Sequence, residues 1–169
     1  MGWWTKLLGR VPGQDGAAAY AAVVAQARDT TWYEQCGVPD TLDGRFAMVS
    51  TVLALVLLRL EGDPAAAVGS VRITERFVAD MDGQLRQIGI GDAVVGKQMG
   101  RVMGLLGGRI GSLRDGLMAG DLGPALERNL YVGDRPEPEA SAWANRRLLA
   151  FAQRLRTLPV DAVLAGTFA

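Results

Sequence analysis

The chain has 169 residues, of which 49% are hydrophobic and 21% charged, and its 18 lysines and arginines balance its 18 aspartates and glutamates. This length predicts one domain with a self-sufficient core, and the zero net charge argues against a module that binds DNA or RNA, because such modules normally carry a basic excess. The lack of histidine and the single cysteine, Cys36, remove histidine-based catalysis, an intramolecular disulfide and nearly all metal sites, so we expect no cofactor.

Helical periodicity runs through the chain, whereas the alternating pattern of strands is missing. Helix caps at Asp40 or Thr41 and at Asp92, and the stop formed by Gly62-Asp63-Pro64, mark boundaries. The predicted helices cover residues 15–29, 30–35, the stretch from the cap at 40 or 41 to about 61, 64–88, 92–119, 122–131 and 139–158, with one more turn in the tail. We therefore expect an all-α, single-domain bundle of six or seven helices over residues 15–169, preceded by an N-terminal segment, 1–14.

Two stretches bear on membrane binding. The longest charge-free apolar run, from Phe46 to Leu58, has thirteen residues, fewer than the roughly 20 that span a bilayer, and is interpreted as a buried core helix. The first ten residues lack the apolar run and cleavage site of a signal peptide. Their Trp3 and Trp4 favour either a membrane surface or docking against the domain. We expect a cytoplasmic protein, with a peripheral contact to the inner membrane as an addition.

Glycines recur between 92 and 119 in one sector of the predicted helix, flanked on one side by Lys97 and Arg101. They stand at Gly96, Gly100, Gly104, Gly107, Gly108 and Gly111. Glycine inside a helix costs up to about 1 kcal/mol relative to alanine, so several of them indicate close approach of another backbone. The approaching helix belongs either to this domain or to another protein. The pair at 107 and 108 is also a point where the helix could bend or break.

Methionine and aspartate each allow two interpretations. Methionine supplies adaptable surface to a binding face or simply fills the core, and four are candidates: Met48, Met81, Met99 and Met103. Four carboxylates could do acid–base work in pairs or serve as caps and ion pairs: Asp40, Asp43, Asp80 and Asp82. For Asp82 the ion-pair partner would be Arg86, one turn later.

Three ordered motifs resemble the ubiquinol–cytochrome c chaperone family. The first is GVPDTLDGRF at 37–46, preceded by Tyr33. The second runs from FVADMD at 77–82 through LR at 85–86 and GIGD at 89–92 to VGK at 95–97. The third is LERNLY at 126–131. The resemblance covers about residues 17–131. One departure is that the stretch from 96 to 111 contains more glycines than the family pattern suggests.

The resemblance implies an assembly factor, not an enzyme, for the cytochrome bc1 complex (respiratory complex III), of the shorter bacterial type. Its implied client is newly made cytochrome b, with a small partner subunit and the ribosome exit region as further partners. We expect an apolar helical groove, flanked by basic residues, to hold a client helix. The candidate partner-binding residues are Tyr33, Pro39, Asp40, Asp43, Arg45, Phe46, Asp80, Asp82, Arg86, Gly96, Lys97, Met99, Gly100, Arg101, Met103 and Gly104.

Two alternatives stay open. A helical protein that binds a quinone or a lipid would have a deep, enclosed pocket. An enzyme would bring the four aspartates together in a cleft with raised pKa values. An exposed apolar groove beside Lys97 and Arg101 would instead favour the chaperone.

Overall fold

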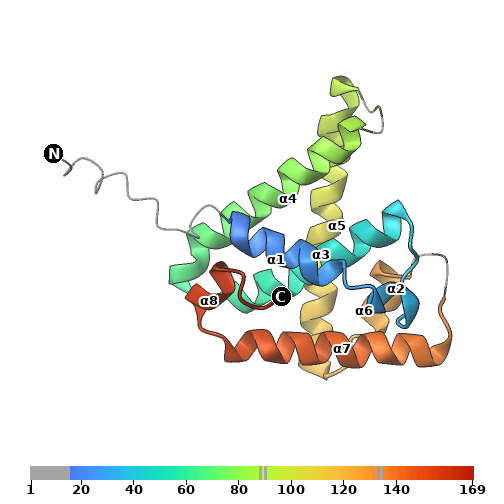
Figure 1. Ribbon diagram of the computed structural model, residues 1–169. Helices are drawn as coiled ribbons and strands as arrows, with labels where there is room; N and C mark the ends of the chain where they lie inside the picture. Colours follow the sequence, from blue (N-terminus) through green and yellow to red (C-terminus); the bar gives the residue numbers. More distant parts are fainter. Residues whose placement is uncertain (1–15, 88, 90, 132, 134) are drawn as a thin grey trace.

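The computed structural model describes residues 16–169 except 88, 90, 132 and 134, and only the backbone of 92 and 93 (Figure 1). Its elements are α1 (Ala17–Ala27), α2 (Thr31–Glu34), α3 (Leu42–Leu60), a 3₁₀ turn (Pro64–Ala66), α4 (Ala67–Gln87), α5 (Asp92–Ala119), α6 (Gly123–Asn129), α7 (Pro138–Thr157) and α8 (Val160–Leu164). Every regular element in these ranges is helical, so the all-α, single-domain prediction is confirmed. The predicted N-terminal segment, 1–14, lies outside the described residues.

Helix ends lie close to their predicted positions because the chemistry that stops a helix is local. Thr41 is the N-cap of α3, and its Oγ1 accepts a hydrogen bond from the Gly44 N–H at 3.1 Å. Gly120, with φ of 72°, ends α5 in the left-handed conformation that favours glycine. The predicted boundaries therefore hold to within a few residues at most positions.

Two boundary predictions need correction, and the possible break in α5 is absent. Gly91, not Asp92, is the N-cap of α5, because Gly91 has an extended backbone conformation and Asp92 is the first residue of the helix. The helix predicted to begin at Pro64 starts with a 3₁₀ turn, which the Asp63 carboxylate tightens by accepting from the Ala65 N–H at 2.9 Å. The helix α5 also continues through Gly107 and Gly108 without a break.

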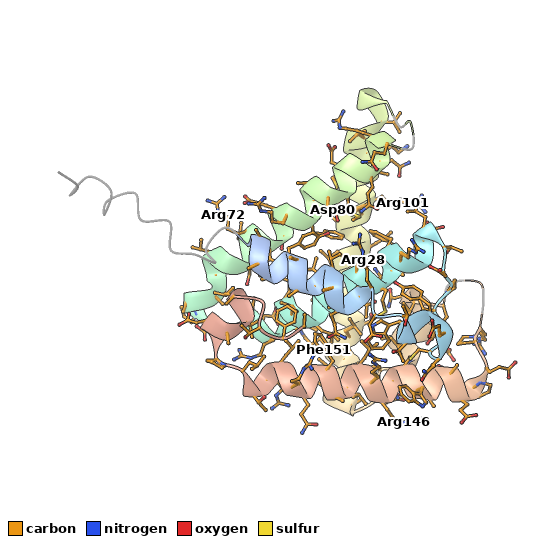
Figure 2. All side chains as sticks on the ribbon, viewed as in Figure 1. Arg28, Arg72, Asp80, Arg101, Arg146 and Phe151 are labelled. Carbon is orange, nitrogen blue, oxygen red and sulfur yellow. The ribbon has the colours of Figure 1, made fainter. Side chains whose placement is uncertain are left out.

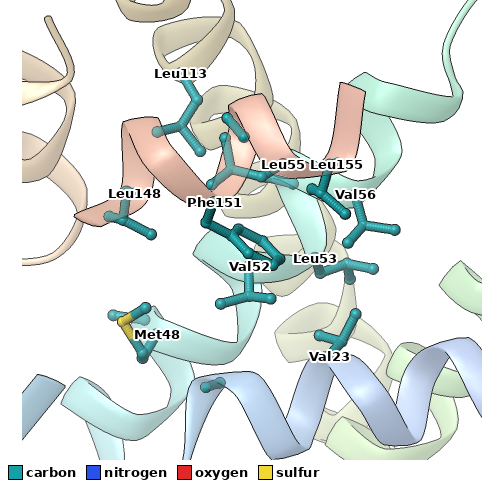
Figure 3. Packing of buried hydrophobic residues seen from close by; sticks show 14 of the residues in the cluster. Val23, Met48, Val52, Leu53, Leu55, Val56, Leu113, Leu148, Phe151 and Leu155 are labelled. Atoms are coloured by element: carbon teal, nitrogen blue, oxygen red, sulfur yellow. The ribbon is translucent and has the colours of Figure 1, made fainter. Parts of the chain in front are cut away.

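Helix α3 forms the centre of the core. Its residues from Ser50 to Val56 are all buried, which confirms the interpretation of the apolar run as a core helix. Figure 3 shows Val52 and Leu53 of α3 among side chains of α1 and α7, including Val23 and Phe151. Among the described helices, none is long and apolar enough to cross a bilayer.

Helices α4 and α5 project beyond this core as an antiparallel arm, formed by residues 78–87 and 92–105 (Figure 1). The arm is tied to the body where α1 crosses α4. There the Tyr20 hydroxyl donates to the Asp80 carboxylate at 2.6 Å, and the Tyr20 ring meets Phe77 edge-on. Past this crossing the two arm helices expose much of their surface, so the arm is accessible to a partner.

Candidate functional site

A shallow groove runs along α4 and meets α5 at Met99. We call it the α4–α5 groove; its lining residues are Ser70, Val71, Thr74, Glu75, Val78, Ala79, Asp82 and Met99. Its volume is about 590 Å³ and it is open to solvent along its length. The floor is apolar and two carboxylates lie at the rim, which is the form expected of a surface that receives an amphipathic partner.

The groove exists because α4 carries apolar side chains on two sides. Its core-facing side repeats every fourth residue and includes Ile73, Phe77 and Met81. Val71 and Val78, one heptad apart, lie on the other side, and Val71 keeps 57% of its surface exposed. A single exposed apolar residue is ordinary, but Val71 and Val78 join Met99 in one contiguous apolar surface, which is typical of an interaction site.

On α5 the groove continues into a stripe of methionine and glycine. Gly96, Met99, Gly100, Met103 and Gly107 follow at spacings of three and four residues, so they share one side of the helix. Met99 packs partly against the core, and Met103 is 37% exposed. These two methionines therefore serve the surface, whereas Met48 and Met81 fill the core.

Six glycines of α5 face open space. A Cβ atom added at any of six positions would meet no atom of a neighbouring element within 4 Å; the six are Gly96, Gly100, Gly104, Gly107, Gly108 and Gly111. The interpretation that a helix of this same domain covers the glycines is therefore wrong for the described residues. Sequence periodicity shows which residues share a helix face, but the packing of the whole domain decides which face is covered.

Charged side chains lie beside the groove on α4 and beside the glycine stripe on α5. Asp82 pairs with Arg86 at 2.8 Å and Glu75 with Arg72 at 2.9 Å, both within α4. The first pair confirms the predicted i, i+4 contact. Lys97 and Arg101 are exposed on α5, and Figure 2 shows Arg101 on the arm, away from Arg146 on α7. Of the predicted partner-binding residues of α4 and α5, Asp82 and Met99 line the groove, whereas Asp80 lies in a second hollow with Tyr20.

The residues of the first motif lie elsewhere and brace the start of α3. The Tyr33 hydroxyl donates to the Ala27 carbonyl at 2.9 Å, and Arg45 pairs with Asp40 at 2.7 Å on the surface. The hydrogen bond from Arg45 lowers the pKa of Asp40. Phe46 stacks on Phe77. None of these side chains lines the α4–α5 groove.

The first and third motifs meet inside the fold. The buried Tyr131 hydroxyl donates to the Cys36 carbonyl at 2.6 Å, which joins the end of the third motif to the residue before the first. Burial raises the pKa of both the Tyr131 hydroxyl and the Cys36 thiol. This contact gives the two motifs a structural role in holding the ends of α2 and α6 together.

The four candidate carboxylates have separate partners. Asp40 and Asp82 form the ion pairs described above, Asp80 accepts from Tyr20, and Asp43 is exposed in the first turn of α3. The ion-pair interpretation is confirmed for Asp40 and Asp82, whereas the contact of Asp80 with Tyr20 is neither a cap nor an ion pair. Within the part of the chain that is described, no group of three or more acidic or cysteine side chains could hold a metal ion.

Sequence reasoning missed Val71, Val78 and the buried Arg109. The signal for the two valines was a second apolar side on α4, opposite to the core-facing one. The signal for Arg109 was a charge within the apolar sector of α5, three residues after Leu106. Arg109 is only 4% exposed and lies over the Phe46 ring, so it belongs to the support of the site and not to its surface.

Comparisons with known proteins support a family assignment. A family model described as "Ubiquinol-cytochrome C chaperone" matches residues 34–169, a range that includes every candidate residue except Tyr33. The crystal structure of the Cbp3 homolog from Brucella abortus is similar with a TM-score of 0.81 and 33% sequence identity, over 96% of this chain and 93% of that chain. No curated protein matches the chain.

Proposed function

Because this chain belongs to the ubiquinol–cytochrome c chaperone family, we propose that it assists assembly of the cytochrome bc1 complex by holding newly made cytochrome b on the α4–α5 groove. The observation that carries this proposal is the exposed apolar surface that extends from Val71 and Val78 of α4 to Met99 and Met103 of α5. No other element of the described chain covers it.

The surface suits a helical client. Transmembrane helices of an unassembled membrane protein expose apolar side chains that aggregate in water, and a groove between two helices can receive one of them. The open glycines at 96, 100 and 104 would let the backbone of that helix approach α5 closely, as small residues do between membrane helices. Met99 and Met103 can adapt their shape to different client side chains.

The flanking charges would orient the client. Lys97 and Arg101 lie on the exposed side of α5, where they can contact acidic loops of cytochrome b or the phosphates of ribosomal RNA at the exit region. A small partner subunit and the surface of the inner membrane are further proposed contacts. The zero net charge of the chain speaks against DNA as a partner.

The quinone- or lipid-binding alternative has no observation in its favour. It requires an enclosed pocket, whereas the α4–α5 groove is open, and so is a second hollow beside Tyr20, Arg28 and Arg76. The space between α1, α3 and α7 is filled by the core side chains that Figure 3 shows.

A photo-crosslinker in place of Arg101 is expected to capture cytochrome b translated in the same extract. The matched control is the same crosslinker in place of Arg45, another exposed arginine, which lies at the start of α3 and not on the arm. The readout is the crosslinked product on a gel, with an unrelated membrane protein as the negative client. Equal capture from both positions, or none from Arg101 after the partner subunit is supplied, would contradict the proposal.

Substitutions of Gly100 separate helix stability from client binding. Gly100→Ala is expected to raise the free energy of unfolding by up to about 1 kcal/mol, because alanine is the better helix former and the added Cβ meets open space. Gly100→Leu is expected to keep the fold and to weaken cytochrome b capture about tenfold or more, since its side chain fills the place of an approaching helix. Thermal unfolding and the capture assay measure the two effects.

The control for this pair is Gly83 on α4, which also faces open space but does not line the groove. Gly83→Leu should leave capture unchanged. Client binding through the glycine stripe is refuted if Gly100→Leu captures as much cytochrome b as the unsubstituted chain.

A further inference from the structure

We propose that α5 pairs with α5 of a second copy of this chain, in an antiparallel arrangement that crosses at Gly108. The surface involved is the outer side of α5, which consists of Gly100, Arg101, Gly104, Gly108, Asp115 and Met118. The pairing itself rests on the exposed side chains and unpaired charges of this helix. Its effect on a client rests on the proposed function above.

The outer side of α5 is open to solvent. Its six residues recur at spacings of one, three, four and seven, so they fall within an arc of about 100° on the helix. All six are exposed, whereas Val95, Leu106 and Leu113 are buried on the opposite side, where α3, α4 and α6 contact α5. Figure 1 shows α3 crossing in front of α5. A second helix can therefore lie along the outer side without displacing any described part of the chain.

Two apolar side chains lie at the edges of the outer side, and neither packs against the core. Met118 is 83% exposed, the largest fraction among the large apolar residues described, and Leu105 is 46% exposed. Single exposed apolar residues are ordinary. These two, however, border a strip of glycine on which the backbone of a second helix can come close enough to cover both.

The charges of the outer side are complementary across a two-fold axis. Arg101 lies in the first half of α5 and Asp115 near its end, and neither forms a hydrogen bond or an ion pair with another described residue. Gly108 is the midpoint between them in the sequence. An antiparallel pair that crosses there places Arg101 of each copy opposite Asp115 of the other, so that one contact forms two ion pairs.

The same charges argue against a parallel pair, which would set Arg101 against Arg101 and Asp115 against Asp115. They also gain nothing within their own helix. The helix dipole favours anions near the N-terminus and cations near the C-terminus, and α5 carries this pair in the opposite order. Two antiparallel helices convert this order into two attractive contacts, and their dipoles then oppose each other favourably.

The size of the contact suits a reversible dimer. It would run from Gly100 to Met118 on each copy, about 27 Å of helix, and Met118 of one copy would lie within about one turn of Gly100 of the other. The zero net charge of the chain gives no overall repulsion between copies. A single helix pair lies at the low end of interface sizes, so we expect a micromolar dissociation constant. A dimer of this strength can give way to a client on the same glycines.

Sedimentation velocity of the full-length chain, from micromolar to millimolar concentration, tests the pairing. We expect a monomer–dimer equilibrium. Arg101→Glu and Asp115→Arg should each raise the dissociation constant about tenfold or more, because like charges then face each other. A mixture of the two variants should restore the dimer, since both contacts between unlike copies again join opposite charges.

The matched control for the charge reversals is Arg146→Glu, at an exposed position on α7, which Figure 2 shows away from the arm. It makes the same change in net charge and should leave the dimer unchanged. A monomer at every concentration overturns the proposal. So does a dimer that Arg146→Glu weakens as much as Arg101→Glu, or one that neither Arg101→Glu nor Asp115→Arg affects.

Symmetric disulfides report the orientation of the two helices. Gly108→Cys places a thiol at the crossing, and Gly96→Cys places one where the two copies would be about 36 Å apart. Because a disulfide needs Cα atoms within about 7 Å, the first should form its dimer at least about tenfold faster. Both glycines face open space, and the native Cys36 is fully buried. Equal rates would mean a parallel or random contact and overturn the arrangement.

Cytochrome b capture separates this proposal from the proposed function. The oxidised Gly108→Cys dimer covers Gly100 and Gly104, so it should capture about tenfold less cytochrome b than its reduced form. Equal capture by both forms, in a chain that meets the charge and disulfide tests, would support the pairing and refute the glycine stripe as the client site. A chain that stays monomeric while Gly100→Leu lowers capture would refute the pairing and leave the proposed function intact.

Discussion

Replacing Gly44 with alanine is expected to lower the free energy of unfolding by about 3 kcal/mol or more. A Cβ atom at this position would lie 1.9 Å from the Pro39 carbonyl oxygen and 2.9 Å from its carbon, so the backbone of the preceding loop would have to move. That loop buries Val38 and positions the Thr41 cap. The better helix propensity of alanine returns only about 1 kcal/mol, so the clash decides the sign.

Chemical denaturation of the Gly44→Ala variant measures this effect directly. In a domain of this size the expected loss corresponds to a fall in Tm of roughly 6–12 °C. Gly83→Ala is the matched control, because the same methyl group meets open space on α4 and should be neutral or stabilising. A loss below about 1 kcal/mol for Gly44→Ala would show that the loop can move away from α3, and that the glycine of the first motif has another role.

The sequence contains enough local information to predict the helices but not their mutual packing. Thr41 and Gly120 stop helices through contacts within a few residues, and both ends lie near their predicted positions. The unbroken course of α5 through Gly107 and Gly108 depends on its support by α3 and α6, which are distant in sequence. Tertiary packing therefore overrides the low helix propensity of the two glycines.

The candidate site was predicted in part for the same reason. Met99, Met103 and the open glycines share a helix face that periodicity reveals, and the structure places this face beside the groove of α4. The residues of the first motif, such as Tyr33 and Arg45, carry the family resemblance without lining the groove. A motif marks residues that a family retains, for bracing as well as for binding, and only the three-dimensional arrangement separates the two.

Replacing Arg109 with alanine is expected to cost about 3–5 kcal/mol of unfolding free energy. The guanidinium is almost fully buried, where it donates to the Ser50 hydroxyl of α3 and to the Asn129 carbonyl of α6. It also lies 5.9 Å from the centre of the Phe46 ring. Alanine would leave a cavity at the junction of the three helices and remove the partner of the Asn129 carbonyl, whose unmet hydrogen bond alone costs about 1–3 kcal/mol.

Arg109→Met separates packing from charge at this junction. Burial without a neighbouring carboxylate lowers the pKa of Arg109 to about 10, so the charged form is held at a desolvation cost. In addition, the Nε atom has no hydrogen-bond partner among the described residues. Methionine fills most of the volume and removes the buried charge, so its loss should be less than half that of alanine.

Hydrogen exchange shows which contact matters. If Arg109 holds α6 against α3, the amides of α6 in the alanine variant should exchange faster by about tenfold or more, while those of α1 change only with global stability. A uniform increase over the whole chain would mean that Arg109 contributes by volume alone. Equal losses for alanine and methionine would mean instead that the two hydrogen bonds outweigh the cavity and the burial of the charge. Arg109 contacts the ring of Phe46, and Phe46 stacks on Phe77 of α4. The same exchange measurement therefore also tests whether this junction stabilises α4, the helix that carries the groove.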